Sequence, residues 1–223
     1  MIPSLSALLG HHIALAGECL PDPAPGITWL WGQDGIFKRG TSDELDVLIW
    51  VGDAPRVPGL AQLLPGVSFR RYGRRLPGQL LPAMLAHARK ACTRASGLAV
   101  MREQQYFVTR QGSTLHARVP AQDASAGRVH YQTLVEPVLL DLHSHHQMPA
   151  YFSATDDADD TGLGVSAVIG RIFDQPELAV RLCCYGHTQR IPALVVFDSL
   201  GPFRDTYLLN EAHLLNEDLY ADA

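Results

Sequence analysis

Apolar residues occur along most of the chain in short runs bounded by glycine, proline or polar clusters, a pattern typical of β-strands. Residues 46–51 and 138–142 are two such runs, and their branched side chains indicate strands buried in a core. Further strands are predicted at residues 98–112, where a polar turn at 102–105 separates two strands, and at 114–120, 164–173, 177–187 and 191–198. The chain is therefore expected to be rich in β-sheet.

One segment has the three- and four-residue spacing of an amphipathic helix, beginning near Leu80. Its apolar stripe consists of Leu81, Met84, Leu85, Ala88 and Cys92. Pro82 fits such a helix because it falls in the first turn, where no intrahelical N–H bond is lost. Weaker helical spacing near the two ends of the chain predicts short helices around Leu5, Leu8 and Leu9 and around Leu208, Leu209, Ala212 and Leu215.

Residues 1–76 differ in character from the remainder and are expected to form a small N-terminal α+β region. A proline-rich link at residues 21–26 precedes a hairpin pattern at residues 27–40, in which the pair Asp34-Gly35 favours a tight turn. Residues 77–223 combine the main helix with strands and predict an α/β (α+β) domain in which a sheet is sandwiched by helices. Within it, residues 121–128 have the composition of a flexible turn.

Charge and cysteine content exclude several classes of protein. The 223 residues include 18 Lys and Arg against 23 Asp and Glu, and a net charge of −5 creates no positive field for nucleic acid or an anionic membrane. Four arginines at residues 70–75 are more simply interpreted as a solvated linker than as a contact for an anionic partner. The four cysteines contain no Cys-x-x-Cys pair, which favours free thiols. No apolar run has the length of a membrane span and the N-terminus lacks a basic signal-peptide start, so we expect a cytoplasmic protein.

A candidate metal site follows the strand predicted at residues 138–142. His143 and His145 are two residues apart, so in an extended chain both imidazoles point to the same side. Asp156 can supply an oxygen ligand from the following turn, and two histidines with one carboxylate leave an open position, as in catalytic zinc sites. A second interpretation stays open, in which the histidines lie at the surface and Ser153 only caps a solvated, acidic helical turn at Asp156–Asp160.

The spacing His143-x-His145, then Ser153, then Asp156 resembles the signature of the JAB/MPN metalloproteases of the JAMM family, which cleave isopeptide bonds to ubiquitin-like proteins. The resemblance implies a JAB/MPN-like, cytidine-deaminase-like fold over about residues 77–200. It also implies that His143, His145 and Asp156 bind zinc and that Ser153 donates a hydrogen bond to the oxyanion of the reaction intermediate.

The sequence of residues 148–160 is similar to a narrower branch of that family, protein A of the plasmid-type PRTRC systems of bacteria. That likeness implies partners among ubiquitin-like proteins or their conjugates and among other members of the same gene system. The sequence does not indicate an oligomeric state.

The general base that the resemblance implies is a glutamate between the main helix and the next strand. The expected position falls near Ser96, and serine cannot act as a base at neutral pH. Glu103 lies further along and would need a changed local path, whereas Asp141 should share the face of His143 because it precedes it by two residues. Glu136, at the start of the motif strand, is too far from the histidines. His146 also departs from the family, whose members usually have proline there.

Three hypotheses remain. The chain is a zinc-dependent peptidase or isopeptidase with an unusual base, or a catalytically silent JAB/MPN-like module that binds partners, or a structural protein whose histidine pair is incidental.

Overall fold

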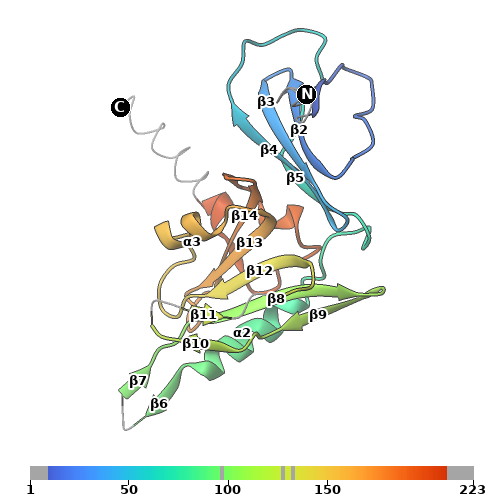
Figure 1. Cartoon of the computed structure of the whole chain (residues 1–223). Helices are drawn as coiled ribbons and strands as arrows, with labels where there is room; N and C mark the ends of the chain where they lie inside the picture. Colours follow the sequence, from blue (N-terminus) through green and yellow to red (C-terminus); the bar gives the residue numbers. More distant parts are fainter. Residues whose placement is uncertain (1–9, 96–97, 127–128, 132–133, 210–223) are drawn as a thin grey trace, which may run out of the picture.

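The structure is a computed structural model that describes residues 10–95, 98–126, 129–131 and 134–209. Figure 1 shows a five-stranded N-terminal sheet standing at one end of a larger sheet. None of the helices in the described ranges is long and apolar enough to cross a membrane.

The N-terminal sheet has the strand order β1-β2-β3-β4-β5. Its strands are β1 (Gly10–Ile13), β2 (Gly26–Gly32), β3 (Gly35–Thr41), β4 (Leu45–Gly52) and β5 (Gly66–Phe69). The predicted hairpin is confirmed, because β2 and β3 pair antiparallel across the two residues Gln33 and Asp34. Residues 10–76 contain strands and no helix, and Pro58, Gly59 and Pro65 interrupt the apolar stretch before β5, so the α part of the expected α+β region depends on residues before 10. The helix predicted around Leu5, Leu8 and Leu9 lies outside the described residues.

Seven strands form the main sheet in the order β15-β14-β13-β12-β8-β9, with β16 paired to β14. They are β8 (Gln104–Gln111), β9 (Thr114–Arg118), β12 (Val138–Ser144), β13 (Leu163–Gly170), β14 (Glu177–Cys184), β15 (His187–Arg190) and β16 (Arg204–Asp205). β12 and β13 are parallel neighbours, so the chain between them must cross over the sheet. That crossover begins with the second histidine of the motif and includes the short helix α3 (Ala154–Asp159).

Two small hairpins lie beside the main sheet, and two segments predicted as turns include strand residues. β6 (Thr93–Ala95) pairs with β7 (Leu98–Val100), and β10 (Gln122–Ala124) pairs with β11 (Val129–Tyr131). Residues 102–105 are not simply a turn, because Gln104 and Gln105 already belong to β8 and pair with the end of β12. Residues 121–128 likewise include β10. Both segments are polar and have weak local preference for strand. Gln104 and Gln105 become strand by pairing with β12, which is distant in sequence, and β10 by pairing with the nearby β11.

The predicted strand at residues 191–198 is also wrong, since Ala193–Val195 form a 3₁₀ helix. Pro192 lacks the N–H that a central strand needs, and the apolar side chains of Val196 and Phe197 are fully buried in the core instead. At the C-terminal end, residues 206–209 are helical, and the other positions of the predicted tail helix, Ala212 and Leu215, lie outside the described residues.

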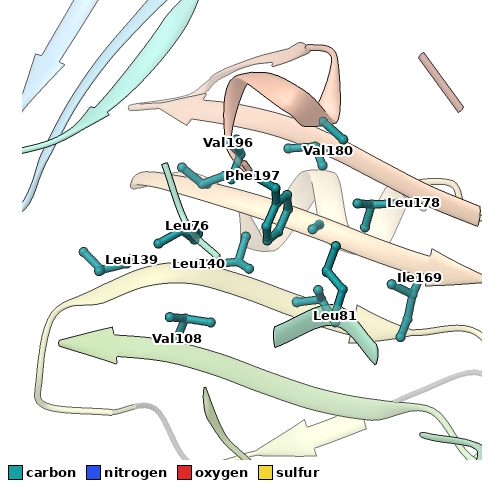
Figure 2. Packing of buried hydrophobic residues seen from close by; sticks show 14 of the residues in the cluster. Leu76, Leu81, Val108, Leu139, Leu140, Ile169, Leu178, Val180, Val196 and Phe197 are labelled. Carbon is teal, nitrogen blue, oxygen red and sulfur yellow. The ribbon is translucent and has the colours of Figure 1, made fainter. Parts of the chain in front are cut away.

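The main helix is confirmed as α2 (Leu80–Ala91), and its predicted stripe Leu81, Met84, Leu85 and Ala88 is buried. Cys92, the fifth predicted position, is the C-cap. α2 covers one face of the sheet, and Figure 2 shows Leu81 beside Phe197 among side chains from several strands, including Leu140, Ile169 and Leu178.

The same core continues into the N-terminal sheet. Buried side chains of β4 and β5 belong to it, namely Leu45, Val47, Ile49 and Phe69. At the contact a Cβ on Gly40 would lie 2.5 Å from a methyl carbon of Leu163, so a larger residue there would require the side chains of Leu163 and Cys184 to shift. Lys38 Nζ donates to the Tyr185 carbonyl oxygen at 2.7 Å. A domain boundary after residue 76 stays a prediction, and Leu76 itself is buried in this shared core.

Candidate metal centre

The face of the main sheet opposite α2 carries the candidate site. Along β12 the side chains alternate, so Leu140 and Leu142 are fully buried in the core on the α2 side, while Asp141 and His143 point to the other face. We call this other face the polar face. His143 lies opposite Val168 of β13 in the sheet.

The two histidines of the motif meet on the polar face. His143 Nε2 and His145 Nε2 are 3.3 Å apart. Two nitrogen ligands of one tetrahedral zinc ion are about 3.3 Å apart, given Zn–N bonds of about 2.05 Å. His145 Nδ1 lies 3.0 Å from the Pro149 carbonyl oxygen, which can only accept, so Nδ1 carries the proton and Nε2 of the neutral ring keeps a lone pair.

Burial lowers the pKa of His143 and also that of His145. Both imidazoles are therefore held in the neutral form at neutral pH, and neutral imidazole is the form that binds a metal ion.

Ser153 and Asp156 form a capping box at the start of α3, which confirms the predicted N-cap. The Ser153 N–H donates to Asp156 Oδ2 at 2.6 Å, the Ser153 hydroxyl donates to the same oxygen at 2.7 Å, and the Asp156 N–H donates to Ser153 Oγ at 3.3 Å. The other carboxylate oxygen, Asp156 Oδ1, lies 3.7 Å from His143 Nε2. One carboxylate thus closes the helix with Oδ2 and faces the histidine pair with Oδ1.

The residues fit zinc in chemical type and in the spacing of the histidine pair. The distance from Asp156 Oδ1 to His143 Nε2 exceeds the spacing of the pair by a few tenths of an ångström. Within the part of the chain that the structure describes, no group of three His, Cys, Asp or Glu side chains already has the full geometry of a metal site.

The loop after the motif is held against the end of β13. A Cβ on Gly170 would lie 2.2 Å from the backbone nitrogen of Ala150, so glycine is required for this close approach. The Ala150 N–H donates to Glu177 Oε2 at 3.1 Å, and Arg171 pairs with the other oxygen of Glu177. These contacts fix the loop and with it the Pro149 carbonyl that orients His145.

Glu103 enters the site through strand pairing. β8 runs antiparallel to β12 with His143 opposite Gln105 and Ser144 opposite Gln104, and Glu103 directly precedes the first residue of β8. Its side chain is buried and lines a pocket of about 550 Å³ together with the two histidines, Ser153 and Asp156. Burial, with a smaller effect of Asp156, raises the pKa of Glu103 to about 7.

The expected base position near Ser96 lies outside the described residues. The chain between α2 and β8 contains the hairpin β6–β7, so the strand next to β12 begins later than the motif spacing suggested. The assignment of Glu103 as the base requires a changed local path of this kind and stays a prediction.

The other polar candidates occupy different places. Gln105 Nε2 donates to Asp141 Oδ1 at 2.5 Å, and burial raises the pKa of Asp141 to about 7. Asp141 is nevertheless not among the side chains that line the pocket. His146 Nε2 lies 2.8 Å from the Ala126 carbonyl oxygen in the link between β10 and β11 and contacts that hairpin rather than the histidine pair. Glu136 pairs with Arg118.

The sequence did not indicate the importance of Arg181. Asp157 and Asp160 were interpreted as part of a solvated turn, yet both pair with the buried guanidinium of Arg181 on β14. No local pattern links residues so far apart, and only a lone arginine within the apolar run of β14 hinted at a buried charge.

Residues 77–183 match the family model described as prokaryotic homologs of the JAB domain. No curated protein sequence matches the chain. The match extends from just before α2 into β14 and contains Glu103, both histidines of the motif, Ser153 and Asp156. The family includes JAMM-type metallo-isopeptidases, and its members can bind zinc. Residues 77–183 are therefore similar to the prokaryotic JAB domains, a family whose fold is the JAB/MPN fold.

Proposed function

We propose that the chain is a zinc-dependent peptidase or isopeptidase of the JAMM type. One observation carries the proposal: a buried glutamate, Glu103, lines the same pocket as the donor set His143, His145 and Asp156. A carboxylate of raised pKa beside a metal-binding set is the arrangement that metal-assisted hydrolysis needs.

The residues divide the reaction between them. When bound, zinc supplies Lewis acidity that polarises the scissile carbonyl and acidifies a water molecule. The neutral imidazoles of His143 and His145 and the Asp156 carboxylate would hold the ion. Glu103 accepts a proton from the attacking water and delivers it to the leaving amine, so hydroxide is added to the carbonyl carbon and a proton to the nitrogen.

Ser153 is the proposed hydrogen-bond donor to the oxyanion. Its hydroxyl proton is directed to Asp156 Oδ2, so Ser153 can donate to substrate only by exchanging that bond for one to the substrate oxygen. A well-aimed donor of this kind is worth about 3 kcal/mol in the transition state.

The substrate is proposed from the resemblance alone, as a ubiquitin-like protein or its conjugate within a bacterial PRTRC-type gene system. The pocket is compatible with this class because its lining by the described residues includes the acidic side chains Glu103, Asp156 and Asp159 and, among those residues, no lysine or arginine. Such a surface disfavours an anionic segment at the scissile bond.

A catalytically silent JAB module that binds partners is the second candidate. It is favoured by the incomplete three-ligand geometry and by the use of Asp156 as a helix cap. Zinc content tests the metal site, because the full chain, expressed with ample zinc, should retain close to one equivalent if it is the peptidase. A silent module can also hold zinc, so only a cleavage assay separates it from the enzyme. A content below about a tenth of an equivalent would exclude the zinc peptidase.

Cleavage of a ubiquitin-like protein carrying a C-terminal fluorogenic amide tests catalysis directly. We expect Glu103→Gln to lower the rate by about 10²- to 10⁴-fold with zinc content unchanged. Glu136→Gln is the matched control, since it removes the same charge away from the pocket, and its rate should equal that of the wild type.

Asp156→Ala should lose both zinc and activity, and Ser153→Ala should lose activity with zinc retained. Equal residual cleavage in the wild type, Asp156→Ala and Ser153→Ala would refute the enzyme. Full activity in Glu103→Gln, combined with loss in Asp141→Asn, would assign the base to Asp141 instead.

A further inference from the structure

The helix α3, which carries Asp156, is not held by hydrophobic burial. It has six residues, and none of them is buried. A helix of this length is not stable alone in water, because nucleation costs more than so few hydrogen bonds return. Polar contacts must therefore keep Asp156 beside the histidine pair.

Arg181 makes those contacts from the centre of β14. Its side chain is only 4% exposed. Nε and Nη2 donate to Asp160 Oδ2 at 2.9 and 2.6 Å, and Nη1 donates to Asp157 Oδ1. The guanidinium carbon also lies 4.0 Å from the centre of the Phe152 ring. A single buried guanidinium thus contacts the residue before the N-cap, the first turn of α3 and its C-cap.

The two proposed functional residues of this segment lie between these contact points. Ser153 directly follows Phe152, and Asp156 directly precedes Asp157. The segment is fixed at both ends, so its position on the polar face determines how far Asp156 Oδ1 lies from His143 Nε2, which is 3.7 Å in this structure.

Burying the charge of an arginine costs folding free energy unless the guanidinium is paired, so the partners of a buried arginine indicate its role. Arg190, the neighbour of Arg181 on β15, provides the comparison. Its guanidinium carbon lies 5.5 Å from the centre of the same Phe152 ring. Arg190 donates to Thr206 Oγ1 and to the Val180 carbonyl oxygen, and within the described chain it makes no hydrogen bond to the carboxylates of α3.

We propose that Arg181 is a positioning residue for the metal centre, which holds α3 on the sheet so that Asp156 can complete the ligand set with His143 and His145. The expected effect of Arg181 on zinc affinity rests on the proposed function. The expected effect of Arg181 on the position of α3 does not rest on it, because that effect can be measured in metal-free protein.

The test compares Arg181→Met, which removes the charge and keeps much of the side-chain length, with Arg181→Lys and with the matched control Arg190→Met. Zinc affinity, measured by chelator competition, should fall about 10- to 100-fold in Arg181→Met. Arg181→Lys should restore part of it, because lysine keeps the charge but cannot form the forked contact. Arg190→Met should bind zinc as the wild type does.

Two further measurements separate positioning from general destabilisation. In metal-free Arg181→Met, the amides of Asp157 and Asp160, which bond to the carbonyl oxygens of Ser153 and Asp156, should lose hydrogen-exchange protection while the amides of β13 keep theirs. Cobalt-loaded Arg181→Met should show a visible spectrum different from that of the wild type, because loss of the Asp156 carboxylate would change the ligand set.

Wild-type zinc affinity together with wild-type protection of the α3 amides in Arg181→Met would overturn the inference. If the wild type binds no zinc, the proposed function fails, and the amide exchange of α3 still decides the role of Arg181. If Arg181→Met does not fold, Asp160→Asn removes the charge of the carboxylate that accepts two of the bonds from Arg181. It should lower zinc affinity in the same direction, and an unchanged affinity would again refute the inference.

Discussion

The two helices on opposite faces of the main sheet are held by different forces. α2 has twelve residues and buries four apolar side chains against the sheet. α3 has six residues, buries none, and is attached by a capping box and by the guanidinium of Arg181. Burial of apolar surface stabilises any arrangement that removes this surface from water. The energy of a forked ion pair, in contrast, depends on the direction and distance between its groups.

The difference separates the fold from the chemistry. The α2 face contains one continuous core that also receives Leu45, Val47, Ile49 and Phe69 from the N-terminal sheet. The polar face holds the histidine pair, Glu103 and Asp156, whose relative positions must be correct to within fractions of an ångström for metal binding and proton transfer. Stability should thus be most sensitive to changes on the α2 face, and metal affinity to changes on the polar face.

The largest effect on stability is expected from Leu81→Ala. Leu81 is fully buried between α2 and the sheet, so truncation should lower the free energy of unfolding by about 2–5 kcal/mol. Urea denaturation measures the loss, and zinc titration of the folded variant should give wild-type affinity. A drop in zinc affinity at this position would show that the two faces are not independent.

A smaller effect is expected from Ser153→Ala on the polar face. Loss of the N-cap should cost about 1 kcal/mol of stability, because the Asp156 N–H loses its acceptor. Ser153→Thr serves as the control, since it keeps the hydroxyl. Hydrogen exchange in α3 reports the change locally, and equal protection in the wild type and Ser153→Ala would argue against a stabilising cap.

The smallest effect concerns an ion pair at the margin of the α2-side core. Arg110 Nε donates to Glu44 Oε2 at 2.8 Å, and Nη2 donates to Oε1 at 2.5 Å, which links the N-terminal sheet to β8. The guanidinium holds the pKa of Glu44 below its ordinary value. The pair therefore stabilises the protein fully above the ordinary glutamate pKa of about 4.3 and loses this contribution as pH falls through the lowered value.

Urea denaturation of the wild type and of Glu44→Gln between pH 3 and pH 7 measures this contribution. The stability difference between them should shrink on acidification, because protonated Glu44 resembles glutamine. A difference that stays constant across this range would contradict the assigned ion pair.

Much of the fold follows from local patterns. The strand at residues 138–142, the hairpin around Asp34 and the stripe of α2 were predicted because alternation, turn residues and helical spacing are properties of neighbouring residues. The errors occurred where distant partners override local preference. Polar Gln104 and Gln105 became strand by pairing with β12, and the apolar segment at residues 191–198 became a 3₁₀ turn that places Phe197 in the core.

The candidate site divides in the same way. The sequence by itself determined the set His143, His145, Ser153 and Asp156, because a strand end and the helix cap that follows it lie close together along the chain. Only the tertiary structure decided that Glu103 joins the pocket and that Arg181 holds α3. Glu103 arrives through the register of β8 against β12, and Arg181 acts from β14, two strands away from β12. Strand register depends on hydrogen bonds between segments distant in sequence, and no spacing within one segment specifies it.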